Sequence, residues 1–127
     1  MKYHHTDSAP EAIGPYSQAI EVDGWLYTSG QVALDPSSGE MLVDDFDGQA
    51  RRVLENLDAV LRTAGCRFQD VVKATVYLTD FADFPALNKL YGEAMGSHRP
   101  CRSTVQVAAL PKGARLEIDL VARIPGR

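Results

Sequence analysis

The pattern of apolar and polar residues predicts a hairpin of strands near the start of the chain. Residues 19–34 follow a GPYSQ sequence and contain two stretches suited to strands, separated by Asp23 and Gly24. An Asp-Gly pair favours the positive φ angles of a tight hairpin turn. Residues 35–39, DPSSG, have the composition of a loop. We therefore expect a β-hairpin that a loop connects to the first helix.

Further along, the apolar spacing becomes that of two amphipathic helices. The first is predicted over residues 47–64 and ends at Gly65, with an apolar stripe formed by Val53, Leu57, Val60, Leu61 and Ala64. The second is predicted to begin near Asp83, a residue type that caps helices, with Pro85 in its first turn and Gly96 at its end. Its expected buried stripe comprises Phe84, Leu87, Tyr91 and Met95.

Three more strands are predicted, over residues 71–78, 102–107 and 114–124. Their apolar residues alternate with polar ones, and the apolar sets are Val72, Ala74, Val76 and Leu78 in the first strand and Leu116, Ile118, Leu120 and Ala122 in the last. These sets are expected to lie beneath the helices, which leaves Glu117 and Asp119 on the opposite face. That face is also expected to hold the polar, uncharged residues Thr75, Tyr77, Thr104 and Gln106, so we infer that another subunit covers part of it.

The order of these elements predicts the fold class. Strands come first, and a helix, a strand, a second helix and two strands follow, with no internal repeat or linker. With 127 residues, of which 45% are apolar, the chain is long enough for one core. We therefore expect a single α/β (α+β) domain over residues 1–127 with a mixed sheet.

Composition and charge argue against several classes of protein. The net charge is −4, which is unfavourable for a protein that binds nucleic-acid backbones or anionic membranes. No stretch approaches about 18 apolar residues, and the N-terminus has no signal-peptide core. Cys66 and Cys101 lie far apart and form no CxxC pair. A cytoplasmic protein with no nucleic-acid partner and no membrane segment is expected.

Histidines and serines give no strong sign of a metal site or of a nucleophile. His4 and His5 would point to opposite sides of a strand, and His98 stands alone in a predicted loop, so no metal is expected. Ser29, in the sequence TSGQ, lacks a GxSxG elbow, which favours a hydroxyl group that lines a pocket.

Arg102 is the candidate for binding a small anion. The alternation of strand 102–107 places Arg102, Thr104 and Gln106 on one side, and a neighbouring last strand would bring Arg102 near Glu117 or Asp119. An arginine in a partly dry pocket binds carboxylates through parallel hydrogen bonds, and a nearby glutamate can position or deprotonate water. The same spacing also fits a structural ion pair between strands, and the sequence pattern leaves both interpretations open.

Five segments of the chain, taken in order, resemble the RidA (YjgF) family of reactive-intermediate deaminases. They are AIGPYSQAI, LYTSGQVALDPSSGE, ENLDAVLRTAG, VVKATVYLTDFADF and RPCRSTVQVAALPKGARLEIDLVA. The resemblance implies a chorismate-mutase-like fold, a mixed sheet with two helices on one face, assembled as a homotrimer with active sites between subunits. It implies hydrolysis of enamines and imines, such as 2-iminobutanoate and 2-iminopropanoate, to 2-oxo acids and ammonia without a cofactor.

The resemblance also assigns roles to individual residues. It implies that Arg102 binds the substrate carboxylate and that Glu117 positions the attacking water. It implies that the other pocket residues are Tyr16, Ser29, Gly30, Asn88 and Thr104. Thr104 stands where many members have Cys, which leaves two alternatives: a subgroup with another small substrate, or a regulatory module that binds 2-oxo acids. An RNA-directed role is a third, disfavoured by the acidic balance.

Overall fold

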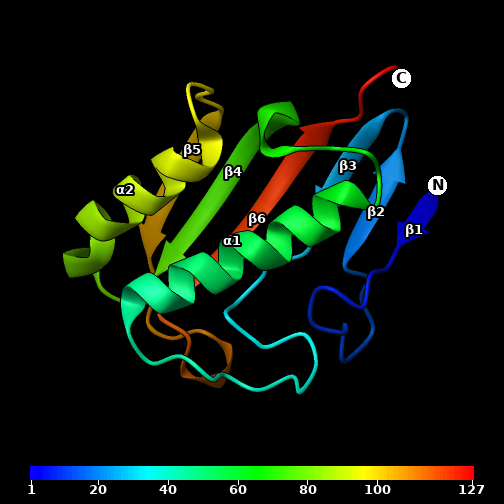
Figure 1. The fold of residues 1–127 in the computed structure, drawn as a ribbon. Helices are drawn as coiled ribbons and strands as arrows, with labels where there is room; N and C mark the ends of the chain where they lie inside the picture. Colours follow the sequence, from blue (N-terminus) through cyan, green and yellow to red (C-terminus); the bar gives the residue numbers. More distant parts are fainter.

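The computed structural model describes residues 1–127 as a six-stranded mixed sheet with two helices packed on one of its faces (Figure 1). The strands are β1 (Lys2–His4), β2 (Ala19–Val22), β3 (Trp25–Thr28), β4 (Val71–Leu78), β5 (Cys101–Gln106) and β6 (Leu116–Arg123). The helices are α1 (Phe46–Arg62) and α2 (Phe84–Met95), with short 3-10 turns η1 (Phe68–Asp70), η2 (Phe81–Asp83) and η3 (Pro111–Gly113). The predicted fold class is confirmed.

The strand order determines which predicted site residues can meet. The order is β1-β2-β3-β6-β4-β5, and every neighbouring pair is antiparallel except β4 and β5. The parallel pair is joined through α2, as such pairs need a long crossover. β4 therefore lies between β5 and β6, and β5 is an edge strand, so the last two strands are not neighbours in the sheet.

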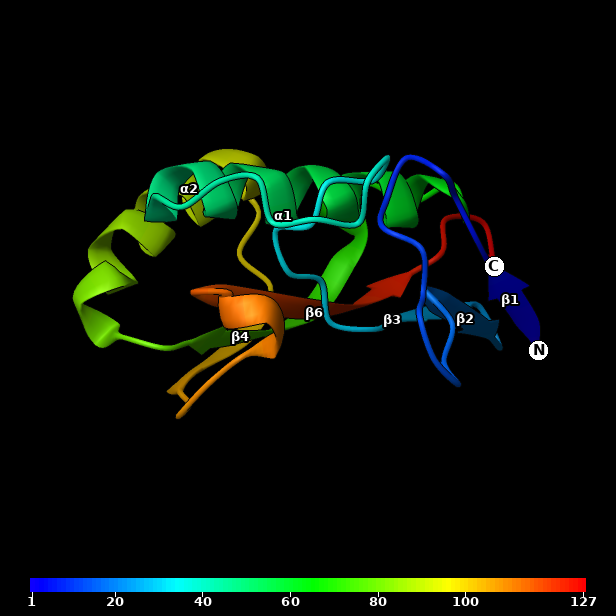
Figure 2. The same cartoon turned by 90° about the horizontal axis from the view of Figure 1, so that it is seen from below.

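The helix face of the sheet holds the core. Four residues of the predicted stripe are buried in α1, with Val53, Leu57, Val60 and Leu61 at 0% exposure, whereas Ala64 follows the end of the helix and is only partly buried. Ala74, Val76 and Leu78 of β4 and Leu116, Ile118 and Leu120 of β6 pack beneath it. Figure 2, seen from below, shows both helices on this side of the sheet and no helix on the other. No helix is both long enough and apolar enough to span a lipid bilayer.

Local details depart from the predictions at three places. The hairpin turn is confirmed, with φ of 52° at Asp23 and 82° at Gly24, but its strands are shorter than 19–34 and a strand at Lys2–His4 was missed. A bulge between Val71 and Lys73 places Val71 in the core and leaves Val72 41% exposed, so Val72 does not share the buried face. Asp83 precedes α2 but makes no capping hydrogen bond.

The carboxylate of Asp83 has a different partner. Nη2 of Arg115 donates to both of its oxygens, at 2.9 and 3.0 Å, and the Arg115 guanidinium lies 5.7 Å from the centre of the Phe46 ring. Arg115 thereby connects the start of β6 to the starts of both helices. This ion pair explains why the aspartate is not free to cap α2.

Candidate active site

Arg102 is a cation without an anionic partner in its own chain. It lies on β5 beside Ala74 of β4, on the side of the sheet that α2 covers. Its guanidinium carbon is 4.9 Å from the centre of the Tyr91 ring and 5.5 Å from that of the Phe84 ring, both on α2. None of the ion pairs of the chain involves Arg102. The structural ion pair left open by the sequence is therefore not formed within the chain.

A cavity of about 470 Å³ adjoins this arginine. Its lining is formed by Asn88, Tyr91, Gly92, Arg99, Pro100 and Arg102. The predicted site residues Asn88 and Arg102 are thus brought together, and the lining contains no acidic residue. A larger hollow, of about 680 Å³, lies at the N-terminal edge between β1 and the end of α1, and it contains none of the predicted residues.

Glu117 lies on the opposite face of the sheet. It pairs with Tyr77 across β6 and β4, and the hydroxyl of Tyr77 is 3.2 Å from Oδ2 of the neighbouring Asp119. Gly30 approaches so closely that a Cβ atom added to it would lie 2.2 Å from Oε2 of Glu117. Burial and, to a smaller extent, the charge of Asp119 raise the pKa of the Glu117 carboxyl. A carboxyl with such a pKa is suited to accepting a proton.

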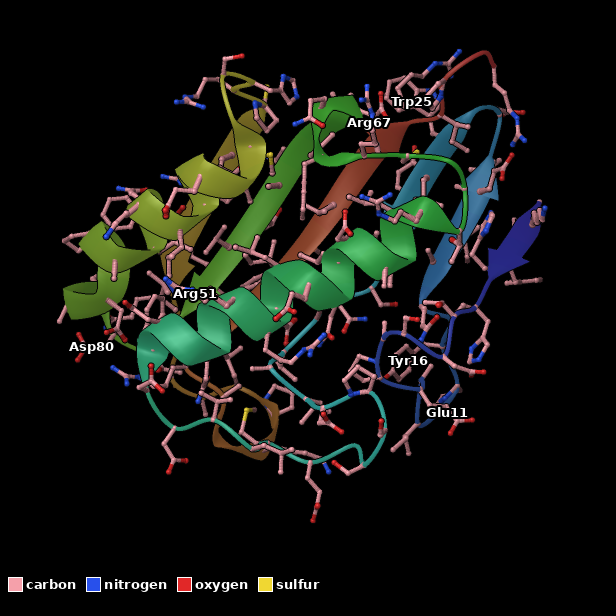
Figure 3. The ribbon with its side chains drawn as sticks, in the orientation of Figure 1. Glu11, Tyr16, Trp25, Arg51, Arg67 and Asp80 are labelled. Carbon is pink, nitrogen blue, oxygen red and sulfur yellow. The ribbon has the colours of Figure 1, made fainter.

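Tyr16 and Ser29 line a separate hollow of about 430 Å³, formed by the β1–β2 loop and the β2–β3 hairpin. The Ser29 hydroxyl donates to the carbonyl oxygen of Ser17 at 2.5 Å. Tyr16 is 54% exposed, and Figure 3 shows it in the loop between β1 and β2, near Glu11. The buried Gln18 holds this loop, because its Nε2 donates to the carbonyl of Pro10 at 2.8 Å and its Oε1 accepts from the Thr6 amide at 2.7 Å. The Ser29 hydroxyl is therefore engaged by the backbone and is not activated by a base.

The expected closeness of Arg102 to Glu117 is wrong within one chain. Parallel pairing places Arg102 beside Ala74 and Thr104 beside Val76, so both lie on the helix face, and Gln106 follows them there. Glu117 lies on the open face, and β4 separates its strand from β5. The candidate residues thus form two groups, one near α2 and one on the open face.

Sequence reasoning missed the role of the α2 aromatic rings. Phe84 and Tyr91 were expected only to fill the core, yet their rings lie against Arg102. Their separation of seven residues, two helical turns, places both on one side of α2. The Tyr91 hydroxyl and the Thr104 Oγ1 are buried and have no hydrogen-bond partner.

The other histidine and cysteine side chains give no sign of a catalytic role. His98 Nε2 lies 2.7 Å from the carbonyl oxygen of Val71, and the buried His4 lies 2.9 Å from Glu21. Burial raises the pKa of the Cys66 thiol to about 11, which makes it a poor nucleophile. No group of three or more His, Cys, Asp or Glu side chains is placed to hold a metal ion.

Comparison with known proteins identifies relatives along nearly the whole chain. The model of the family described as Endoribonuclease L-PSP matches residues 6–124. A human protein named 2-iminobutanoate/2-iminopropanoate deaminase is 49% identical over 92% of this chain and 85% of its own length. The solved structure of RidA from an Antarctic Psychrobacter superposes with a TM-score of 0.93 at 44% identity, covering 98% of this chain and all of that one. TdcF of E. coli, solved with bound serine, gives a TM-score of 0.91 at 40% identity and covers 97% of this chain and 98% of its own.

Proposed function

The chain belongs to the Endoribonuclease L-PSP family, which includes RidA, and from this premise we propose that it hydrolyses 2-imino acids to 2-oxo acids and ammonia. The observation that carries the proposal is the unpaired Arg102 beside an open cavity. A relative named as an imine deaminase at 49% identity supports it, and so does the serine, itself an amino acid, bound to TdcF. Substrates of the 2-iminobutanoate and 2-iminopropanoate type each carry one carboxylate for Arg102.

The proposed reaction needs little beyond positioning. The oxygen of water adds to the imine carbon and gives a carbinolamine with a C–N single bond. After proton transfer from the hydroxyl to nitrogen, this bond breaks as the C=O bond forms, and the products are a 2-oxo acid and ammonia. Because imines react with water unaided, fixing the carboxylate places the reacting carbon relative to one water molecule. No metal ion or organic cofactor enters this scheme.

Arg102 and Glu117 have complementary roles in the proposal. Arg102 binds the substrate carboxylate through its guanidinium, which the rings of Phe84 and Tyr91 flank. Glu117, whose pKa is raised by burial, accepts a proton from the attacking water. Gly30 leaves room for that carboxylate because any side chain at position 30 would displace it.

We further propose that the complete site forms between subunits of a homotrimer. Arg102 and Thr104 lie on the face of the sheet that α2 covers, and Asn88 lies on α2 itself. Tyr16, Ser29, Gly30 and Glu117 belong to the other group, so one chain alone does not unite them. The edge strand β5 is free to approach a second copy, and Val105, on its open face, is 41% exposed. The neighbour would supply Glu117 opposite Arg102.

The activity is tested with 2-iminobutanoate generated in situ by a threonine dehydratase, following the release of 2-oxobutanoate above the uncatalysed rate. Arg102→Ala should lower kcat/KM by about two orders of magnitude, because a charged hydrogen-bonded pair contributes about 1.5–3 kcal/mol. The matched control is Arg51→Ala, an exposed arginine on α1 that forms no ion pair (Figure 3). Equal rates for wild type and Arg102→Ala would overturn the proposal.

The shared site has its own test, co-expression of Arg102→Ala with Glu117→Gln. In randomly mixed trimers about one quarter of the interfaces would join an intact arginine to an intact glutamate, so about a quarter of the wild-type activity should return. A site inside one subunit would give no recovery. A monomer by light scattering would also contradict the assembly.

Two further measurements separate the alternatives. A sensor of 2-oxo acids would show thermal stabilisation by 2-oxobutanoate without turnover of the imine. An RNA-cleaving protein, as the family description suggests, would degrade RNA at physiological salt and be unaffected by Arg102→Ala.

A further inference from the structure

The cavity beside α2 carries more positive charge than a single carboxylate requires. Two of its lining residues are arginines, Arg99 and Arg102, and none is acidic. Neither guanidinium forms an ion pair with a carboxylate of the chain. If Arg102 binds the carboxylate next to the imine carbon, Arg99 remains as an uncompensated charge at the same cavity.

Arg99 is held in place by the end of α2. Its Nη1 donates to the carbonyl oxygens of Gly96 at 2.6 Å and His98 at 2.8 Å. These bonds satisfy carbonyl groups at the C-terminal end of the helix, where positive charge is favoured. They use one guanidinium nitrogen, and no acceptor in the chain receives a hydrogen bond from Nε or Nη2. Arg99 is therefore anchored yet keeps donors for a ligand.

Tyr91 lies close to both charges. Burial raises the pKa of the Tyr91 hydroxyl, and the positive charges of Arg102 and then Arg99 act against that rise. The hydroxyl is buried and has no hydrogen-bond partner. Both guanidinium groups thus act on the same wall of the cavity, which Tyr91 helps to form. The space beside Gly92 in this wall is open, since a Cβ atom added there would meet nothing within 4 Å.

We propose that the site prefers 2-imino acids that carry a second anionic group, with Arg102 binding the carboxylate beside the imine carbon and Arg99 binding the distal one. The inference rests on the proposed deaminase function and names its substrate class, the 2-imino dicarboxylates. The reaction is unchanged: water adds to the imine carbon, ammonia leaves, and the distal carboxylate is retained. Because Arg99 is exposed to solvent, its effect is moderate and decreases with salt.

The test compares two imines of equal chain length, made in situ by an amino-acid oxidase with catalase. Glutamate gives 2-iminoglutarate, which has the second carboxylate, and 2-aminopentanoate gives 2-iminopentanoate, which lacks it. Release of the two 2-oxo acids gives kcat/KM for wild type, Arg99→Gln, Arg99→Lys and the control Arg51→Gln. Melting temperatures check that each variant is folded.

Wild type should prefer 2-iminoglutarate, and Arg99→Gln should reduce that preference about fivefold. Arg99→Lys, which keeps the charge, should restore part of it, and added salt should lower it in wild type. A preference that is equal in wild type and Arg99→Gln would overturn the inference.

Turnover of neither imine by wild type or Arg51→Gln would instead overturn the proposed function. Titration calorimetry with 2-oxo acids would then test the two-anion site independently of turnover. Tighter binding of 2-oxoglutarate than of 2-oxopentanoate, reduced by Arg99→Gln, supports the site, and equal binding contradicts it.

Discussion

The guanidinium carbon of Arg102 lies 4.9 Å from the centre of the Tyr91 ring, so an edge strand and a helix together hold the cation. The ring of Phe84 lies 5.5 Å away on the same helix. Aromatic faces attract a cation without neutralising it, so the charge stays available for a substrate carboxylate. An acidic partner would have occupied the same hydrogen-bond donors. The two rings thus make Tyr91 and Phe84 positioning residues for Arg102.

This arrangement predicts that the ring of Tyr91 matters more than its hydroxyl for placing Arg102. Tyr91→Leu should raise KM for 2-iminobutanoate about tenfold more than Tyr91→Phe does, because a desolvated cation–π contact contributes up to about 2 kcal/mol. Steady-state kinetics on both variants measures this. Tyr91→Phe should also raise the free energy of unfolding by about 1 kcal/mol, since it removes a buried hydroxyl without a partner. Equal KM values for the two variants would contradict the positioning role.

A second prediction concerns the pH profile. Burial, then the Asp119 charge, raise the pKa of Glu117, and the proposed mechanism needs Glu117 deprotonated. Activity is therefore lost as the pH falls through this raised pKa. Asp119→Asn removes the neighbouring negative charge, so the acidic limb of the kcat/KM profile should move to lower pH. Asp44→Asn, at an exposed position, is the control, and an unmoved limb in Asp119→Asn would exclude Glu117 as the titrating group.

Gly30→Ala should disable the site with little loss of stability. The added Cβ would lie 2.2 Å from Oε2 of Glu117, the far end of a flexible side chain, so the carboxylate moves and the backbone does not. We expect activity to fall at least about tenfold, since misplaced catalytic groups lose their positioning advantage. At Gly48, remote from the site, an added Cβ would lie 2.2 Å from Val43 and 2.9 Å from the Asp45 carboxylate that caps α1. Gly48→Ala is therefore the control for a steric clash that should leave kcat/KM unchanged. Urea unfolding and steady-state rates on both variants separate the two effects.

The sequence predicted which residues share a face better than it predicted which face that is. Alternation correctly grouped Arg102 with Thr104, but assigned them to the open face because polar residues were expected to avoid the helices. On an edge strand, polar residues can lie on the helix face, because β5 pairs only with β4 and its other edge stays open beside α2. Pairing with Ala74 and Val76 of β4 decides the matter, and such long-range pairing is not encoded in the local pattern.

Helix α1 was predicted well because its local apolar pattern alone determines which side is buried. Val53, Leu57 and Val60 are completely buried because a helix has only one stripe that can face the sheet. For the site, motifs singled out Asn88 and Arg102, which meet at one cavity. The contribution of Tyr91 was hidden because a buried aromatic residue on a helix stripe has the same sequence pattern whether it packs against leucine or against arginine.

Asn56 provides the last prediction, one of stability. It is completely buried on α1, and its Nδ2 donates to the carbonyl oxygens of Val32 at 3.2 Å and Leu34 at 3.0 Å. Asn56→Leu has a similar volume but leaves both carbonyls without this donor. The Val32 carbonyl still accepts from the Leu34 amide at 2.8 Å, so only the Leu34 carbonyl is left unsatisfied. A buried group left unsatisfied costs about 1–3 kcal/mol, so the free energy of unfolding should fall by about that amount.

Urea unfolding measures that loss, and Arg51→Leu, an exposed neighbour on α1, should change the free energy of unfolding by less than about 0.5 kcal/mol.

The segment that Asn56 tethers, residues 32–34, directly follows Gly30 and Gln31. Asn56→Leu should therefore also lower kcat/KM at temperatures where the protein remains folded. The Gln31 amide bonds the Ile118 carbonyl at 2.9 Å, next to Glu117, so loosening the segment loosens the packing around that carboxylate. A fully stable Asn56→Leu variant would show that water satisfies the Leu34 carbonyl and that the tether is dispensable.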